Sequence, residues 1–307
     1  MEHPEKFLRQ EFGNLFYLKE KSIGPPSQYL GNKVTQVTLE NGQICWSLSS
    51  SQYVRNAVKN VEDYRNSKGL GPLMRATSPW PRDYRPESDL TPELSSDESS
   101  FYQSLIGTLR WIVELGRADL VMETSALASM MARPREGHLN ALFHIFAFLK
   151  KRHNGVIVFD PTEPKIDASK FKKEDWSATP YGICMEEIPK DAPEPFGLEF
   201  TMRAFVDSDH AGDSITRRSR TGFIIFLNNA PIYWFSKKQT SCETSSFGAE
   251  FIAMKTCCEY VRGLRYKLRM MGIPVNLPTY IFCDNKSVLA NASVPHSSLK
   301  KKSSSVA

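Results

Sequence analysis

Hydrophobic and polar residues alternate near the beginning of the chain and then change to a helical spacing. The β-rich segments 29–38 and 44–48 flank the turn sequence Glu-Asn-Gly at 40–42, which predicts a β-hairpin. Val54 and Val58 lie on one face of a segment that follows two serines able to cap a helix. A hairpin followed by an amphipathic helix is therefore expected.

A helical pattern dominates the next part of the chain. Three helical segments are expected from Asp97 to Lys151, with breaks near 116–119 and at Pro134. Two apolar stripes at helical spacing indicate that these helices pack on each other. The stripes consist of Leu105, Leu109, Ile112 and Val113, and of Leu142, Ile145, Phe146 and Leu149. A short strand is expected at 156–159.

Two segments rich in proline and charge interrupt the periodic pattern. Residues 66–97 predict a long surface loop, and residues 161–200 predict a linker that separates two domains. After this linker the pattern predicts three strands, a long helix, a strand and a helix. These lie at 203–208, 222–227, 231–235, 245–270, 279–283 and 286–292. This order favours an α/β protein of the α+β type, with a mixed sheet and helices.

Charge is distributed unevenly between the two predicted parts. The 307 residues are 41% hydrophobic, enough for a buried core, and carry a formal net charge of +5. Residues 201–307 contain 15 basic and 7 acidic residues, a net charge of +8, so residues 1–200 carry a net charge of −3. A basic C-terminal third indicates a polyanionic partner.

The cysteines and the hydropathy pattern bear on the cellular compartment. The six cysteines form no Cys-x-x-Cys pair, which favours free thiols in a reducing compartment over disulfides or a zinc finger. The N-terminal sequence MEHPEKFLRQ lacks the apolar core of a signal peptide, and no segment is apolar enough to span a bilayer. An intracellular protein without membrane contact is expected.

Three carboxylates occupy positions that require a partner. Asp207 and Asp284 each end an apolar strand segment, and Glu250 lies among apolar residues in the first turns of the long helix. Acids converging on one sheet edge would suit Mg²⁺ or Mn²⁺. For each acid alone, a turn or helix-cap role is the competing interpretation.

Five ordered sequence motifs surround these acids. They are FVDSDHAGD (205–213), RRSRTGFIIFL (217–227), PIYWFSKKQT (231–240), SSFGAEFIAMK (245–255) and CDNKSVLA (283–290). Together they resemble the RNase H domain of copia-type retrotransposon Pol polyproteins. The earlier motifs QYLGNKV (28–34), LSSSQYVRNAVKN (48–60) and YQSLIGTLRWIVELGRADL (102–120) resemble the reverse-transcriptase thumb and connection of the same family, with Gly-Arg-Ala-Asp replacing its usual Thr-Arg-Pro-Asp.

The resemblance implies a domain organisation. Residues 1–160 would be a mainly helical thumb and connection remnant that includes the proline-rich loop 66–97. Residues 161–200 would be a linker, and 201–307 an RNase H-like domain that is incomplete at its C-terminus. No Tyr-x-Asp-Asp motif occurs, so a polymerase active site is not expected in this chain.

The resemblance also implies a function and its residues. The activity would be endonucleolytic hydrolysis of the RNA strand of an RNA/DNA hybrid, using two Mg²⁺ or Mn²⁺ ions. Asp207, Glu250 and Asp284 would be both catalytic residues and metal ligands, with Glu250 also orienting the attacking water. Asp209, His210 and Asp213 would lie outside this core as supporting residues. Nucleic-acid contacts would come from Arg217, Arg218, Arg220, Lys237, Lys238 and Asn285.

One absence keeps a second hypothesis open. The family places a fourth Asp in a later helix, beyond Ala307, so the alternative is a catalytically inactive nucleic-acid-binding remnant of a degraded element. The expected partners are an RNA/DNA hybrid and the remainder of the Pol polyprotein. The expected location is cytoplasmic, including virus-like particles, or nuclear.

Overall fold

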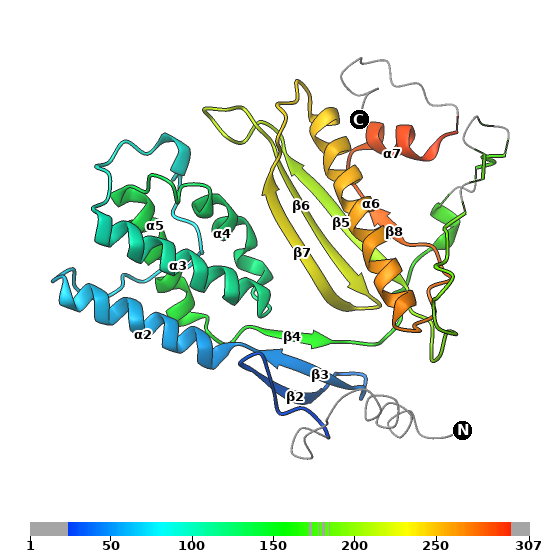
Figure 1. Cartoon of the computed structure of the whole chain (residues 1–307), viewed down its shortest axis with the longest axis horizontal. Helices are drawn as coiled ribbons and strands as arrows, with labels where there is room; N and C mark the ends of the chain where they lie inside the picture. Colours follow the sequence, from blue (N-terminus) through cyan, green and yellow to red (C-terminus); the bar gives the residue numbers. More distant parts are fainter. Residues whose placement is uncertain (1–23, 172–173, 178, 180–181, 184, 296–307) are drawn as a thin grey trace.

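The computed structural model describes residues 24–171, 174–177, 179, 182–183 and 185–295. The N-terminal sequence MEHPEKFLRQ, Cys184 and residues 296–307 lie outside the described residues. Figure 1 shows a group of helices on one side, a mixed sheet with a long helix on the other, and a small sheet beneath the helices. We call the first the helical unit (residues 51–151) and the second the sheet unit (residues 202–293).

The small sheet confirms the predicted hairpin and strand. β2 (Asn32–Thr38) and β3 (Ile44–Ser49) pair antiparallel across the predicted turn, where Gly42 has a positive φ of 82°. β4 (Val156–Phe159) adds to β3, and the two-residue β1 (Gln28–Tyr29) adds to β2. A strand that follows the helices in sequence therefore returns to the hairpin that precedes them.

The helical unit confirms the expected helices. They are α2 (Ser51–Ser67), α3 (Ser96–Glu114), α4 (Val121–Ala128) and α5 (Glu136–Lys151). A capping box formed by Ser95 and Glu98 begins α3 at Ser96, one residue before the predicted start at Asp97. Tyr102 is fully buried and donates its hydroxyl hydrogen bond to the Leu127 carbonyl at 2.7 Å, which fixes α3 against α4.

The Gly-Arg-Ala-Asp segment has a structural role. Arg117 is only 4% exposed, and its guanidinium pairs with both carboxylate oxygens of Asp119 at 2.8 and 2.7 Å. It also donates to the Arg152 carbonyl at the end of α5. Gly116 adopts a φ of +115° beside Ile157, a conformation that favours glycine. The segment therefore ties the helices to the small sheet.

The sheet unit has the strand order β7-β6-β5-β8. Its elements are β5 (Met202–Asp209), β6 (Arg220–Leu227), β7 (Ala230–Lys238), α6 (Ser246–Met270), β8 (Tyr280–Phe282) and α7 (Lys286–Ser293). β5, β6 and β7 form an antiparallel meander, whereas β8 pairs with β5 in parallel. The predicted order of elements and the mixed sheet are confirmed.

Each unit has its own hydrophobic core. In the sheet unit Ala204 and Val206 of β5 pack against Ala253 and Cys257 of α6, and Tyr233 joins this cluster. Trp234, the next residue of β7, packs instead against the core of the helical unit. Its indole N–H donates to the Val113 carbonyl at 3.2 Å. One residue of β7 thus connects the two units.

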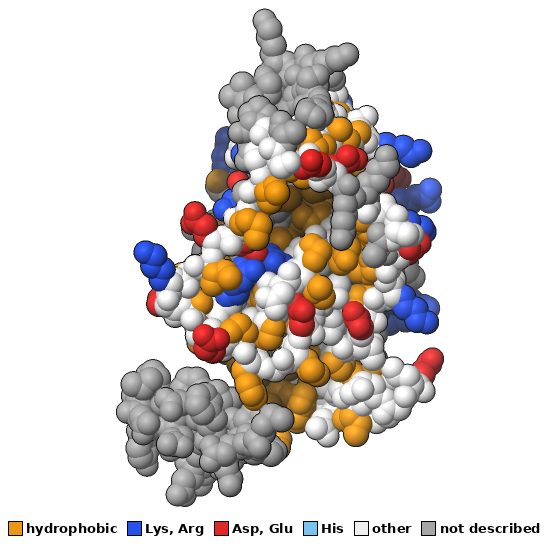
Figure 2. All heavy atoms as spheres, turned by 90° about the vertical axis from the view of Figure 1, so that its right-hand side faces the viewer, with side chains coloured by type: hydrophobic (Ala, Val, Ile, Leu, Met, Phe, Trp, Pro, Cys, Tyr) orange, Lys and Arg blue, Asp and Glu red, His pale blue; other side chains and the backbone are white. Residues whose placement is uncertain are grey.

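The linker runs along the sheet unit without forming a strand in its described part. Arg265 and Arg269 of α6 bind Glu186, whose pKa these hydrogen bonds lower to about 2, that from Arg269 contributing most. These two arginines therefore fasten the linker. Figure 2, which views this side, shows hydrophobic side chains gathered around a hollow. Large exposed side chains of the linker include Ile183, Met185, Ile188, Phe196 and Leu198.

Among the described residues, no helix combines the length and apolarity needed to cross a membrane.

We expect the core of the sheet unit to control its stability. Ile225 on β6 is fully buried, so Ile225→Ala should lower the free energy of unfolding by about 2–5 kcal/mol. The matched control Ile215→Ala, on an exposed loop residue, should change it by less than about 0.5 kcal/mol. Urea denaturation followed by tryptophan fluorescence measures both variants. Equal destabilisation by the two substitutions would contradict this description of the core.

Candidate metal centre

The three candidate acids are brought together by the parallel pairing of β5 with β8. In this register Phe205 lies opposite Phe282, so Asp207 and Asp284, each two residues further along, lie at the same end of neighbouring strands. Glu250 belongs to the second turn of α6, which packs across β5 and β6. The fold therefore brings together, at one end of the sheet, three acids that are more than 30 residues apart in sequence.

Glu250 is the buried member of the group. Only 7% of the surface of Glu250 is exposed, whereas Asp207 and Asp284 are exposed residues. Burial raises the pKa of the Glu250 carboxyl, and the charges of Asp207 and Asp284 raise it further, while neighbouring Ser208 opposes the shift. Donor atoms of Glu250 and Asp284 lie within 4.8 Å of each other, whereas Asp207 stands outside this close group but near enough for its charge to act on Glu250.

The arrangement fits a divalent cation. The Oε2 atom of Glu250 is buried and has no hydrogen-bond partner among the described residues. An orphaned carboxylate oxygen beside two further carboxylates is costly unless a cation compensates it. Oxygen-only donors of this kind are the ligands that Mg²⁺ and Mn²⁺ prefer.

Sequence reasoning missed Cys283 as a member of this cluster. Donor atoms of Glu250, Cys283 and Asp284 all lie within 4.8 Å of one another. Burial raises the pKa of the Cys283 thiol, and the carboxylates of Glu250, Asp284 and Asp207 add to this effect, opposed by the backbone at Asn285. The position of Cys283 directly before Asp284 was visible in the sequence, but a single cysteine carries no local signal of metal proximity.

The three predicted supporting residues occupy a different neighbourhood. His210 contacts the Glu243 carbonyl at 3.2 Å, and Asp209 lies opposite Arg220 in the β5–β6 register. Asp213 pairs with Lys238 and accepts backbone hydrogen bonds from its own loop. The charges with the largest effect on the pKa of Glu250 are those of Asp207 and Asp284.

The predicted nucleic-acid residues separate into free and engaged groups. Arg217, Arg218 and Lys237 are exposed. Arg220 instead donates to Ser125 of the helical unit at 2.9 Å, and Lys238 is paired with Asp213. Asn285 caps α7 by accepting hydrogen bonds from the Ser287 and Val288 amides, both at 3.1 Å.

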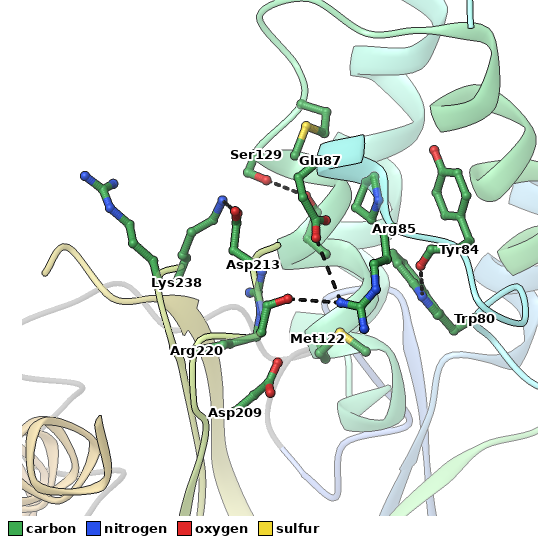
Figure 3. Close-up of a pocket in the computed structure, with 15 residues that line it drawn as sticks. Trp80, Tyr84, Arg85, Glu87, Met122, Ser129, Asp209, Asp213, Arg220 and Lys238 are labelled. Atoms are coloured by element: carbon green, nitrogen blue, oxygen red, sulfur yellow. Dashed lines mark hydrogen bonds and ion pairs between the residues drawn. The ribbon is translucent and has the colours of Figure 1, made fainter. Parts of the chain in front are cut away.

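A cleft of about 170 Å³ lies between the two units, next to the engaged residues. Figure 3 shows Arg85 and Glu87 of the proline-rich loop reaching toward the β5–β6 loop. Arg85 donates to the Gly212 carbonyl at 3.1 Å, and Glu87 accepts from the amide and hydroxyl of Ser214 at 3.0 and 2.9 Å. The predicted surface loop 66–97 is therefore also a contact between units, which its composition did not indicate.

Comparisons with known proteins agree with part of the sequence interpretation. No protein-family model matches the chain, and no solved structure matches it. The chain is, however, distantly similar to retrotransposon Pol polyproteins, at 21–26% identity.

Three relatives define the extent of this similarity. The retrovirus-related Pol polyprotein from transposon RE1 of Arabidopsis thaliana is 26% identical over 60% of this chain, and that from transposon TNT 1-94 of Nicotiana tabacum is 21% identical over 88%. The chain spans only 10% and 17% of these two proteins. An uncharacterized mitochondrial protein of Arabidopsis thaliana is 24% identical, with 76% of each chain covered.

The ion pair between Asp213 and Lys238 makes a testable contribution to stability. Burial alone would raise the pKa of Asp213, but hydrogen bonds from Lys238 and Thr216 outweigh it and lower the pKa to about 2. A depressed folded-state pKa contributes stability at neutral pH that is lost as pH falls from about 4 to about 2. Asp213→Asn should therefore lower the free energy of unfolding at pH 7 by up to about 2 kcal/mol.

Urea denaturation at pH 7 and at pH 3 measures this effect. The difference between the native protein and Asp213→Asn should shrink at the lower pH. Asp83→Asn, a substitution at an exposed acid of the helical unit, serves as the control. A difference of equal size at both pH values would show that the carboxylate charge of Asp213 does not stabilise the fold.

Proposed function

We propose that the sheet unit is an RNase H-like domain of a retrotransposon Pol protein that hydrolyses the RNA strand of an RNA/DNA hybrid. The observation that carries this proposal is the meeting of Asp207, Glu250 and Asp284 at one sheet edge, with a buried oxygen of Glu250 left without a partner. The five ordered motifs around these acids and the distant similarity to Pol polyproteins support it.

The proposed chemistry depends on divalent metal. Asp207, Glu250 and Asp284 would hold Mg²⁺ or Mn²⁺, two ions in all, which would activate a water and stabilise the leaving oxygen of the phosphodiester. Glu250 is buried, so its carboxylate can act as a fixed ligand. Asp207 and Asp284 are exposed, so a phosphodiester can approach from their side. The amide of Ser208 donates to Asp207 at 2.8 Å and orients its carboxylate.

Hybrid binding would use basic side chains near this edge. Arg217, Arg218 and Lys237 are exposed in the part of the chain that carries a net charge of +8. Such residues neutralise phosphates without reading sequence. Arg220 and Lys238 would instead hold the β5–β6 loop and β7 in place, because their side chains are already engaged.

The helical unit would be the thumb and connection of the adjoining reverse transcriptase. Its support is the similarity to the TNT 1-94 polyprotein, which covers 88% of this chain and so includes residues of both units. Trp234 and Glu87 make the contacts that join this unit to the sheet unit. The remainder of the Pol polyprotein is the expected covalent or non-covalent partner.

Cleavage of a labelled RNA/DNA hybrid in Mg²⁺ or Mn²⁺ tests the proposed activity. Asp207→Asn and Glu250→Gln should each lower the rate by about a hundredfold or more, since each removes a metal ligand worth several kcal/mol in the transition state. Glu259→Gln, at an exposed position of the same helix, should leave the rate unchanged. Thermal denaturation verifies that each variant is folded.

The outcome distinguishes between the two hypotheses that the sequence left open. Cleavage that survives Asp207→Asn and Glu250→Gln would exclude these acids as the catalytic site. Salt-dependent binding of the hybrid without cleavage in either metal would instead support the inactive nucleic-acid-binding remnant.

The salt dependence of hybrid binding tests the proposed contacts. Arg218→Ala and Lys237→Ala should each weaken binding and reduce the slope of log K against log salt by about 1, because each removes one phosphate contact. Arg82→Ala, on an exposed residue of the helical unit, should leave the slope unchanged. Fluorescence anisotropy at several salt concentrations gives the slopes. Identical slopes for the native protein and all three variants would place the hybrid elsewhere.

A further inference from the structure

The cluster at the sheet edge contains a sulfur donor in addition to its carboxylates. Cys283 ends the β8 segment directly before Asp284, and its Sγ lies within 4.8 Å of a donor oxygen of both Glu250 and Asp284. The thiol is free and partly buried. Three potential ligands of two chemical types therefore surround one position.

A second observation identifies this position as a place for a cation. Glu250 is more than nine-tenths buried, and its Oε2 has no hydrogen-bond partner among the described residues. The nearest acidic groups, Asp207 and Asp284, repel it electrostatically. Ser208 partly offsets the charge of the Glu250 carboxylate, but Oε2 itself has no hydrogen-bond partner among the described residues, so a bound cation would compensate it.

We infer that Glu250, Cys283 and Asp284 form a binding site for a thiophilic divalent cation of the Zn²⁺ type. Thiolate ligands favour Zn²⁺, whereas Mg²⁺ requires oxygen donors and retains its waters. Three protein ligands leave a fourth tetrahedral position for water. Binding would displace the thiol proton of Cys283 to solvent.

Occupation of this site would oppose the proposed activity. A Zn²⁺ ion held by Cys283 would use Glu250 and Asp284, two of the three carboxylates that the proposed hydrolysis requires. Zinc should therefore inhibit the magnesium-dependent reaction, and the loss of the thiol should relieve this inhibition. The inhibition rests on the proposed function, but the binding site itself does not.

Cobalt substitution tests the site without relying on activity. The full chain, reduced and free of metal, is titrated with Co²⁺, which takes zinc sites and gives a near-ultraviolet charge-transfer band when a thiolate binds it. The native protein should show this band, and added Zn²⁺ should abolish it. Cys283→Ser should remove the band and weaken Zn²⁺ binding at least about tenfold, since a ligand is lost.

Cys258→Ser is the matched control. Cys258 is a half-buried thiol on α6, eight residues and thus about 12 Å along the helix from Glu250, so its removal should leave the band intact. If Cys283→Ser does not fold, Asp284→Asn, on an exposed residue, should weaken Zn²⁺ binding while retaining the band. Absence of the band from the native protein, or its persistence in Cys283→Ser, would overturn the inference.

The same preparations separate this inference from the proposed function. A cobalt band that depends on Cys283, in a protein that does not cleave the hybrid, would support the site and refute the hydrolysis. Magnesium-dependent cleavage that Zn²⁺ inhibits equally in the native protein and in a folded Cys283→Ser variant, together with the absence of the band, would do the opposite.

Discussion

The parallel pairing of β5 with β8 is the contact on which the candidate metal centre depends. The two strands are separated by a meander and a 25-residue helix, so their pairing requires a crossover that places α6 against the sheet. That crossover brings Asp207 and Asp284 to one end of the sheet and Glu250 beside them. A shift of β8 by one residue would turn Asp284 toward the opposite face of the sheet. The spacing of the acids is therefore a consequence of strand register.

The edge strand opposite β8 in this sheet, β7, contacts the helical unit. β7 faces the helical unit, where Trp234 enters the neighbouring hydrophobic core and donates to Val113. The β5–β6 loop is held from the same side, through Glu87 and Ser214. Polar contacts of this kind fix orientation more than they add stability, because exposed hydrogen bonds and ion pairs are weak. The loop that follows Asp207 is thus restrained by a segment more than 100 residues earlier in the chain.

Local sequence patterns were sufficient for the elements, and they placed the three candidate acids at the strand ends and in the helix where the fold has them. Alternation predicted the hairpin and the strands, helical spacing predicted α2 to α6, and strand ends within recognisable motifs identified Asp207 and Asp284. The strand pairing of the small sheet could not be predicted in this way. β4 pairs with β3 although four α-helices lie between them in sequence, and no local pattern encodes that pairing. The core that Trp234 enters likewise depends on the docking of the two units, which no local pattern encodes.

The partners of charged side chains were the least predictable feature. Arg220 and Lys238 lie among other basic residues, which is typical of a nucleic-acid surface, yet the fold supplies Ser125 and Asp213 as their partners. Arg265 and Arg269 likewise bind Glu186 of the linker. Cys283 escaped notice because only the folded chain brings its sulfur near Glu250. In each case the deciding contact joins residues far apart in sequence, or depends on which way a side chain faces.

The central claim is that three carboxylates from β5, α6 and the end of β8 form a divalent-metal centre. A crystal structure of the protein soaked in Mn²⁺, with anomalous difference maps, tests this most directly. We expect anomalous peaks among Asp207, Glu250 and Asp284, and their loss in Asp207→Asn crystals. Well-ordered carboxylates at this edge with no anomalous peak among them at saturating Mn²⁺ would contradict it.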